Sequence, residues 1–130
     1  MINLTAYAPL TIFMKVKLIP MKTFPMHDFD MNDLYVVWQD LSDNTLVMDN
    51  RTPEEFARGH VPGSRNIPEG TENAHVDELR QFDCVYLYCR SGRRAQVAAS
   101  NLNSQGLDHI VCLRDCGMPD WEKAGYPVET

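Results

Sequence analysis

The sequence lacks the features that define several common classes of protein. No apolar run among its 130 residues reaches the roughly 20 residues that a membrane-spanning helix needs. Its four cysteines form no Cys-x2-Cys pair and no histidine stands at the spacing of a zinc finger, so we expect no metal site. Internal repeats and low-complexity tracts are also absent. A single globular domain that needs no cofactor is therefore the simplest interpretation.

Positive charge is scarce and unevenly placed. The formal net charge is −6, so we expect neither nucleic acid nor an anionic membrane as a partner. Between residues 28 and 83, thirteen acidic residues stand against four basic ones. Between residues 84 and 114 the balance reverses, and only Asp108 opposes four arginines: Arg90, Arg93, Arg94 and Arg114. This cationic zone predicts a small anion as the substrate.

Disulfide bonds are not required, because the chain is larger and richer in core residues than the small proteins that depend on a disulfide scaffold. Residues 2–14 are mildly apolar, but no lysine or arginine precedes them as in a signal peptide. We therefore expect the cytoplasm as the location and a monomer or weak dimer as the assembly. Residues 1–21 are predicted to be a poorly ordered N-terminal extension and residues 22–130 a single domain.

Strand and helix patterns alternate along this domain. Short strands are predicted at residues 24–29, 45–49, 66–68, 84–88 and 110–113. Helices are predicted after Asn32, from Thr52 to about Gly59, over 76–82, over 93–105 and around Trp121, with a loop at 70–73. This α/β alternation implies a parallel sheet with helices on both faces. Ligands of such sheets bind outside the carboxyl ends of the strands, where Asp49, Cys89 and Arg114 are expected.

The stretch from Val85 to Leu102 organises the chemistry. An apolar strand stops at Cys89 and a helical pattern starts about four residues later. A loop that enters a helix N-terminus points backbone N–H groups at one spot and favours an anion there. Three arginines within five residues of Cys89 argue against the alternative, a buried strand-end cysteine without chemistry. We therefore predict that Cys89 is a thiolate nucleophile.

Three motifs in the expected order resemble those of the rhodanese-like sulfurtransferases. The amino-terminal signature of that family resembles residues 49–68, DNRTPEEFARGHVPGSRNIP. Its active-site loop resembles residues 88–95, YCRSGRRA, and its carboxy-terminal signature resembles GMPDW at 117–121 with AGYPV at 124–128. The resemblance covers about residues 24–129 and implies a three-layer rhodanese-like fold. Its sheet would have five parallel strands in the order 3-2-4-5-1.

The resemblance also implies transfer of a sulfane sulfur through a persulfide on the loop cysteine. Cys89 would attack a donor such as thiosulfate, and the loop residues would bind that donor: Arg90, Ser91, Gly92, Arg93 and Arg94. Cyanide, a thiol or a partner protein would then accept the sulfur. Related phosphatases and arsenate reductases have a Cys-x5-Arg loop, whereas this chain has Cys-x4-Arg and Ala95. Mercaptopyruvate-type members have Cys-Gly-Ser-Gly, whereas Arg90 here favours thiosulfate, a dianion.

Two classes of function remain open. One is a stand-alone thiosulfate sulfurtransferase, and the other is a persulfide carrier that delivers sulfur to a partner protein with little turnover of its own. The complete loop and Cys89 favour chemistry in both cases.

The remaining candidates support the loop or depart from the family pattern. In the resemblance, Asp49 and Arg51 form a pair behind the loop, which we expect to orient it. His60 is expected to be structural, because it lies in a turn away from the strand ends. The family usually has Gly-Gly where this chain has Cys116-Gly117, which puts the usual close packing in doubt. We hypothesise that Cys116 resolves an oxidised or persulfidated Cys89 through a reversible disulfide, the alternative being a silent small residue.

Overall fold

A four-stranded parallel sheet forms the centre of the structure, a computed structural model that describes residues 28–130. Its strands lie in the order β2-β1-β3-β4. They are β1 Thr45–Asp49, β2 Arg65–Asn66, β3 Cys84–Tyr88 and β4 Ile110–Cys112. β1 pairs with β3 over its whole length, from Thr45 opposite Cys84 to Asp49 opposite Tyr88. The carboxyl ends of these two central strands therefore meet at one edge of the sheet.

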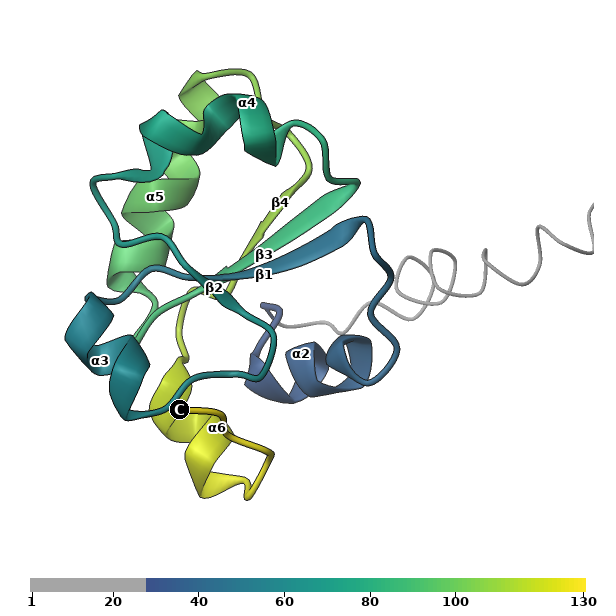
Figure 1. Cartoon of the computed structure of the whole chain (residues 1–130), viewed down its shortest axis with the longest axis vertical. Helices are drawn as coiled ribbons and strands as arrows, with labels where there is room; N and C mark the ends of the chain where they lie inside the picture. The colour runs from purple at the N-terminus through teal and green to yellow at the C-terminus, as the bar shows by residue number, and fades with distance from the viewer. Residues whose placement is uncertain (1–27) are drawn as a thin grey trace, which may run out of the picture.

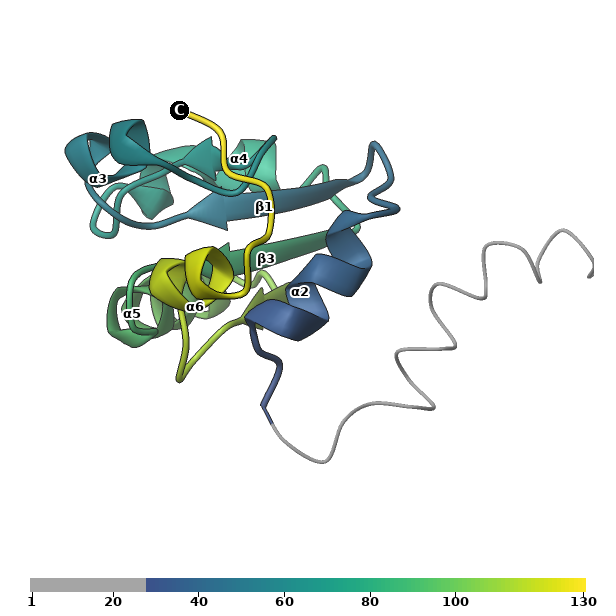
Figure 2. The same ribbon diagram turned by 90° about the horizontal axis from the view of Figure 1, so that it is seen from below.

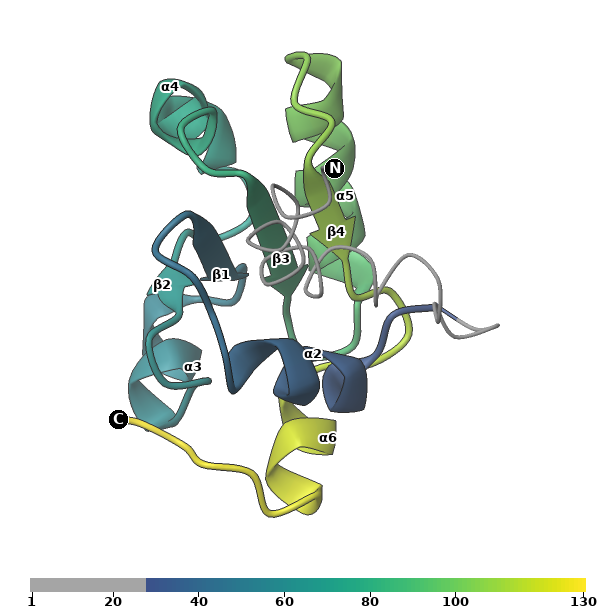
Figure 3. The same ribbon diagram turned by 90° about the vertical axis from the view of Figure 1, so that its right-hand side faces the viewer.

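Successive residues along each strand contribute their side chains to two separate hydrophobic cores, one on each face of the sheet. Leu46, Met48 and Leu87 point to one face, where α4 Val76–Leu79 and α5 Arg93–Ser104 cover them. Val47 and Tyr88 point to the other face, where α2 Met31–Trp38 and α6 Met118–Lys123 cover them. Figures 1 and 3 show these helix pairs on opposite sides of the sheet. The structure thus confirms the α/β class with helices on both faces.

Local capping signals explain where two helices begin. Thr52 accepts a hydrogen bond from the Glu55 amide, and the Glu55 carboxylate accepts one from the Thr52 amide. This confirms the predicted start of the helix α3 Pro53–Arg58. The start of α2 differs from the prediction, because Asp30 and not Asn32 is the cap. Asp30 accepts from the Asn32 and Asp33 amides, so a carboxylate two residues earlier satisfies the free N–H groups.

The described residues contain four strands where five were predicted. Of the expected first strand, residues 24–27 lie outside the described part, and Asp28 and Phe29 are not in a strand. The predicted five-strand order is therefore not confirmed, and the predicted extension at residues 1–21 also lies outside the described part. The predicted loop at 70–73 is partly a 3-10 helix, η1 Glu72–His75. Within residues 28–130, no helix is long and apolar enough to span a membrane.

The C-terminal segment closes one side of the molecule. After α6 it runs back toward α3, as Figure 2 shows, and Glu129 forms an antiparallel bridge with His60. Trp121 is fully buried and donates its indole N–H to the Pro127 carbonyl at 2.5 Å. Its ring contacts Tyr126 edge to face, with 5.0 Å between centroids. These contacts of Trp121 pack the C-terminal segment against α6.

Candidate active site: the cysteine loop and its surroundings

Cys89 lies between the end of β3 and the start of α5, on the loop that the sequence singles out. Its side chain is buried, and its Sγ accepts a hydrogen bond from the Gly92 amide at 3.1 Å. Gly92 is the residue that caps α5, so the sulfur lies at the positive end of a twelve-residue helix. The sulfur thus faces a hydrogen-bond donor and the partial positive charge of a helix N-terminus.

Two glycines allow the loop to be this tight. Gly92 has φ of 96°, and a Cβ built there would stand 1.5 Å from the Arg114 carbonyl oxygen. A Cβ on Gly117 would stand 2.1 Å from the Arg90 carbonyl oxygen and 2.4 Å from that of Cys89. The next amide, of Met118, donates to the Cys89 carbonyl at 2.9 Å. The close packing that Cys116 put in doubt is therefore present, and it depends on Gly117.

The arginines of the loop have different surroundings. Arg90 and Arg93 are exposed, and neither has an ion-pair partner among residues 28–130. Arg94 instead forms two hydrogen bonds with the Glu55 carboxylate, at 2.7 and 3.0 Å. The bound guanidinium lowers the pKa of Glu55 from its ordinary 4.5 to about 2, and Glu55 raises the pKa of Arg94. Arg94 therefore holds α3 against α5, whereas the guanidinium groups of Arg90 and Arg93 are not bound by any residue in the described part of the chain.

Asp49 and Arg51 form the predicted pair behind the loop. The Arg51 Nη2 lies 2.7 Å from Asp49 Oδ2, and both side chains are buried. The same nitrogen donates to the Gly59 carbonyl at 2.7 Å, which ties the end of β1 to the end of α3. Burial opposes the charge on Arg51, but the hydrogen bond and charge of Asp49 outweigh it and raise the pKa of Arg51. The pair thus fixes the wall beside the loop.

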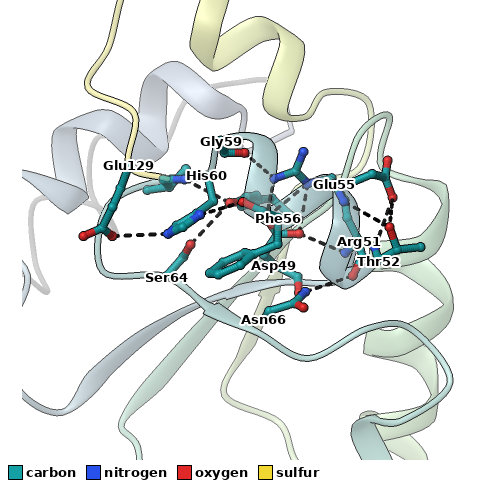
Figure 4. A network of polar contacts seen from close by, with 12 residues as sticks. Asp49, Arg51, Thr52, Glu55, Phe56, Gly59, His60, Ser64, Asn66 and Glu129 are labelled. Atoms are coloured by element: carbon teal, nitrogen blue, oxygen red, sulfur yellow. Dashed lines mark hydrogen bonds and ion pairs between the residues drawn. The ribbon is translucent and has the colours of Figure 1, made fainter.

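His60 belongs to a network that joins α3 to the C-terminal segment (Figure 4). Its ring stacks on Phe56 with 3.5 Å between centroids, and its Nδ1 lies 2.8 Å from the Phe56 carbonyl oxygen. Its Nε2 lies 3.2 Å from Glu129 Oε1. The Gly63 amide also donates to that carboxylate, which lowers the pKa of Glu129. These contacts agree with the structural role expected for His60.

A hollow of about 340 Å³ lies between α3 and α6, beside the loop. We call it the α3–α6 hollow. Its lining includes Arg51, Glu55, Arg58, Arg90, Met118 and Glu122. Arg90 follows Cys89 directly, and Met118 is bonded to the Cys89 carbonyl, so the hollow adjoins the loop backbone. Arg58 and Glu122 are the members that the sequence analysis missed, since no local pattern brings α3 and α6 together.

Cys116 and Cys89 belong to different hydrophobic cores. Cys116 belongs to the core on the α2 and α6 face, whereas Cys89 belongs to the core on the α4 and α5 face. Burial raises the pKa of Cys116 to about 12, which keeps it a thiol near neutral pH. The resolving role hypothesised for Cys116 stays a prediction, which the separate cores of the two cysteines disfavour. All four cysteines are unpaired. Among the described residues, no three His, Cys, Asp or Glu side chains gather as a metal site.

Comparison with known proteins identifies the family. The family described as the Rhodanese-like domain matches residues 33–124, which is more than half of the chain. The chain therefore belongs to the rhodanese-like sulfurtransferase family, as its three motifs predicted.

Individual relatives agree with this assignment. The chain is 37% identical over 81 residues to a Bacillus subtilis protein named putative sulfur carrier protein YrkF, covering 62% of this chain but only 43% of that relative. It is 32% identical over 89 residues to a protein of Ectopseudomonas mendocina named thiosulfate sulfurtransferase GlpE, covering 68% of this chain and 80% of that protein. The crystal structure of a rhodanese-related protein from Thermoplasma volcanium superposes with a TM-score of 0.66 at 28% identity, covering 79% of this chain and 97% of that one.

Proposed function

We propose that this protein transfers a sulfane sulfur from thiosulfate through a persulfide on Cys89 to a thiophilic acceptor. The observation that carries the proposal is the hydrogen bond of 3.1 Å from the Gly92 amide to Cys89 Sγ, at the N-terminus of α5. Arg90 and Arg93, both exposed on the segment that follows Cys89, suit a dianionic donor. A reducing compartment such as the cytoplasm suits a chain whose four thiols are unpaired.

The first step loads the cysteine. The Cys89 thiolate attacks the outer sulfur of thiosulfate, and a new S–S bond forms on Cys89. The original S–S bond of thiosulfate breaks, and its electron pair leaves with sulfite. Negative charge grows on the leaving group as that bond stretches. Arg90 and Arg93 stabilise this charge from solvent, while the Gly92 amide holds the attacking sulfur.

The second step removes the sulfur from Cys89. A nucleophile such as cyanide or a thiolate attacks the outer sulfur of the persulfide, and the electron pair of the broken S–S bond returns to Cys89. The Gly92 amide then binds the regenerated thiolate. No other side chain has to change its protonation state, so one buried cysteine suffices for both steps.

A persulfide carrier is the second candidate. It is favoured by the similarity to the protein named as a putative sulfur carrier, 37% identical over 81 residues. Both candidates load Cys89, and they differ in whether a small acceptor can unload it repeatedly.

Steady-state turnover separates the two candidates. Thiocyanate is measured while thiosulfate and cyanide are in excess, and intact mass spectrometry follows the persulfide on the protein. A sulfurtransferase releases many thiocyanates for each chain. A carrier gains one sulfur but releases about one thiocyanate per chain. A chain that gains no sulfur from thiosulfate contradicts both candidates.

A further inference from the structure

The charges around the α3–α6 hollow divide into those with partners and those without. Arg51 is bonded to Asp49 and to the Gly59 carbonyl, and Glu55 is bonded to Arg94. Arg58, Arg90 and Glu122 also line the hollow, but their side chains have no hydrogen-bond or ion-pair partner among residues 28–130. The hollow therefore presents positive and negative charge at once, and both are available to a ligand.

Glu122 is held close to the α3 side of the hollow. Its Oε2 lies 3.7 Å from the point where a side-chain carbon on Gly59 would stand. Because Gly59 has no side chain, the carboxylate from α6 approaches the backbone directly after Arg58. The Arg58 guanidinium and the Glu122 carboxylate line the same space but make no ion pair with each other. Each can thus bind a group of opposite charge on one small molecule.

We propose that the α3–α6 hollow binds the sulfur acceptor, a small thiol that carries both an amine and a carboxylate. This inference rests on the proposed function and names its acceptor class. Glu122 recognises the ammonium group, and Arg58 with Arg90 recognises the carboxylate. A purely anionic acceptor would meet the Glu122 carboxylate, which disfavours it. The volume of about 340 Å³ is at the low end of the range of about 300–1,000 Å³ for small-ligand pockets, which favours a small molecule over a protein.

The transfer balances without a further reactant. The acceptor thiolate attacks the outer sulfur of the Cys89 persulfide, and a new S–S bond forms on the acceptor. The S–S bond to Cys89 breaks, its electron pair remains as the Cys89 thiolate, and the product is the acceptor persulfide. Arg90 connects the two sites, because it follows Cys89 in the loop and also lines the hollow.

Four thiols that differ only in their charged groups test this assignment. They are L-cysteine with both groups, cysteamine with the amine, 3-mercaptopropionate with the carboxylate, and 2-mercaptoethanol with neither. The full chain is first loaded with thiosulfate or with inorganic polysulfide, and loading is verified by intact mass. The rate of sulfur loss to each thiol is then measured for the wild type and for Glu122→Gln and Arg58→Gln. The ratio of wild-type to variant rate cancels the intrinsic reactivity of each thiol.

We expect Glu122→Gln to slow transfer to cysteine and cysteamine about three-fold, with little effect on the other two thiols, as for exposed ion pairs. We expect Arg58→Gln to slow transfer to cysteine and 3-mercaptopropionate by a similar factor. Glu54→Gln and Lys123→Gln are matched controls, because they remove the same charges from exposed positions on α3 and α6 outside the hollow. Equal ratios for all four thiols in a loaded protein overturn the inference and leave the proposed function intact.

A second measurement does not depend on loading. S-methyl-L-cysteine keeps both charged groups but cannot accept sulfur, and it is titrated into the unloaded chain. The inference predicts saturable shifts of the Arg58 and Glu122 amide resonances that weaken in both hollow variants and persist in both controls. The absence of such shifts overturns the inference, whether or not the protein can be loaded with sulfur. A failure of sulfur loading alone would contradict only the proposed function.

Discussion

The charged residues around Cys89 form two groups that have similar chemistry and different surroundings. The first group is the pairs Asp49–Arg51 and Glu55–Arg94, in which each charge has a partner within 3.0 Å. We call these the wall pairs. The second group is Arg58, Arg90 and Glu122 at the hollow, which we call the hollow charges. Burial and partners decide the role of each residue, because a satisfied charge fixes geometry while an unsatisfied exposed charge is free to bind.

The largest effect is expected from breaking the buried wall pair. Arg51→Leu leaves the fully buried Asp49 carboxylate without its guanidinium, and should lower the free energy of unfolding by about 3–5 kcal/mol. Urea unfolding followed by circular dichroism measures this change. Arg51→Lys is the control, because it keeps the positive charge but loses the two-pronged guanidinium contact. Its free energy of unfolding should lie between those of the wild type and Arg51→Leu. An Arg51→Leu protein as stable as the wild type would contradict the role of this pair.

Loss of a hollow charge should impair sulfur loading and leave the stability of the fold nearly unchanged. Arg90→Gln should slow the loading of Cys89 by thiosulfate, because the loading transition state loses a charged hydrogen bond. We expect the activation free energy to rise by about 1.5–3 kcal/mol, the range for hydrogen bonds to charged groups. The unfolding free energy of this variant should change by less than about 0.5 kcal/mol, because the side chain is exposed and has no partner among residues 28–130. Single-turnover loading is measured with thiosulfate and with an uncharged sulfane donor. Equal losses with both donors would mean that Arg90 only shapes the loop.

The partly exposed wall pair should give a smaller and pH-dependent effect. The folded-state pKa of Glu55 is about 2, below its ordinary 4.5, so the unfolded chain binds a proton more readily between these values. The stability that Glu55 contributes is therefore complete above about pH 4.5 and is lost as the pH falls toward 2. Since solvent screens the pair, we expect Glu55→Gln to cost about 1 kcal/mol at neutral pH.

Urea unfolding of the wild type and Glu55→Gln between pH 2 and 7 measures this difference. The two curves should converge as the pH approaches 2. Glu54→Gln is the control, because Glu54 is an exposed neighbour outside the pair. A difference that does not depend on pH would show that Glu55 acts through its shape alone.

The smallest effect is expected at Cys116, which belongs to neither group. Its thiol is buried on the opposite face of the sheet from Cys89, so mild peroxide should produce no peptide that links the two cysteines. Cys116→Ala should then over-oxidise at Cys89 as fast as the wild type, as measured by peptide mapping without reductant. A linked peptide that disappears in the variant would restore the resolving role and show that the segment rearranges.

Local signals in the sequence predict much of this structure. The Thr52 cap and Pro53 fix the start of α3, and the apolar run before Cys89 fixes β3 and the loop. The wall pair of Asp49 and Arg51 is also local, since only Asn50 separates them in the chain. The motifs alone thus predicted the position of the cysteine loop and one of the two wall pairs, and they single out Cys89 as the candidate nucleophile.

Contacts between distant segments were not predictable in the same way. The ion pair of Arg94 was not foreseen, because its partner Glu55 stands 39 residues earlier, on a helix whose position only the fold determines. The role of Arg94 in binding the donor stays a prediction. Cys116 was placed by its distance along the chain from the strand end, whereas the path of the loop between β4 and α6 decides which core it enters. Glu122 and Arg58 line the same hollow although 64 positions separate them in the chain, and only the fold brings α3 and α6 to it.

The central claim is that Cys89 alone carries the transferred sulfur, and intact mass spectrometry after thiosulfate treatment tests it directly. Two complementary variants are compared with the wild type: Cys89→Ser, and a chain in which Cys84, Cys112 and Cys116 are all replaced by alanine. We predict that the triple variant gains one sulfur atom as the wild type does, and that folded Cys89→Ser gains none. Sulfur uptake by Cys89→Ser at the wild-type yield, with none in the triple variant, would contradict this account.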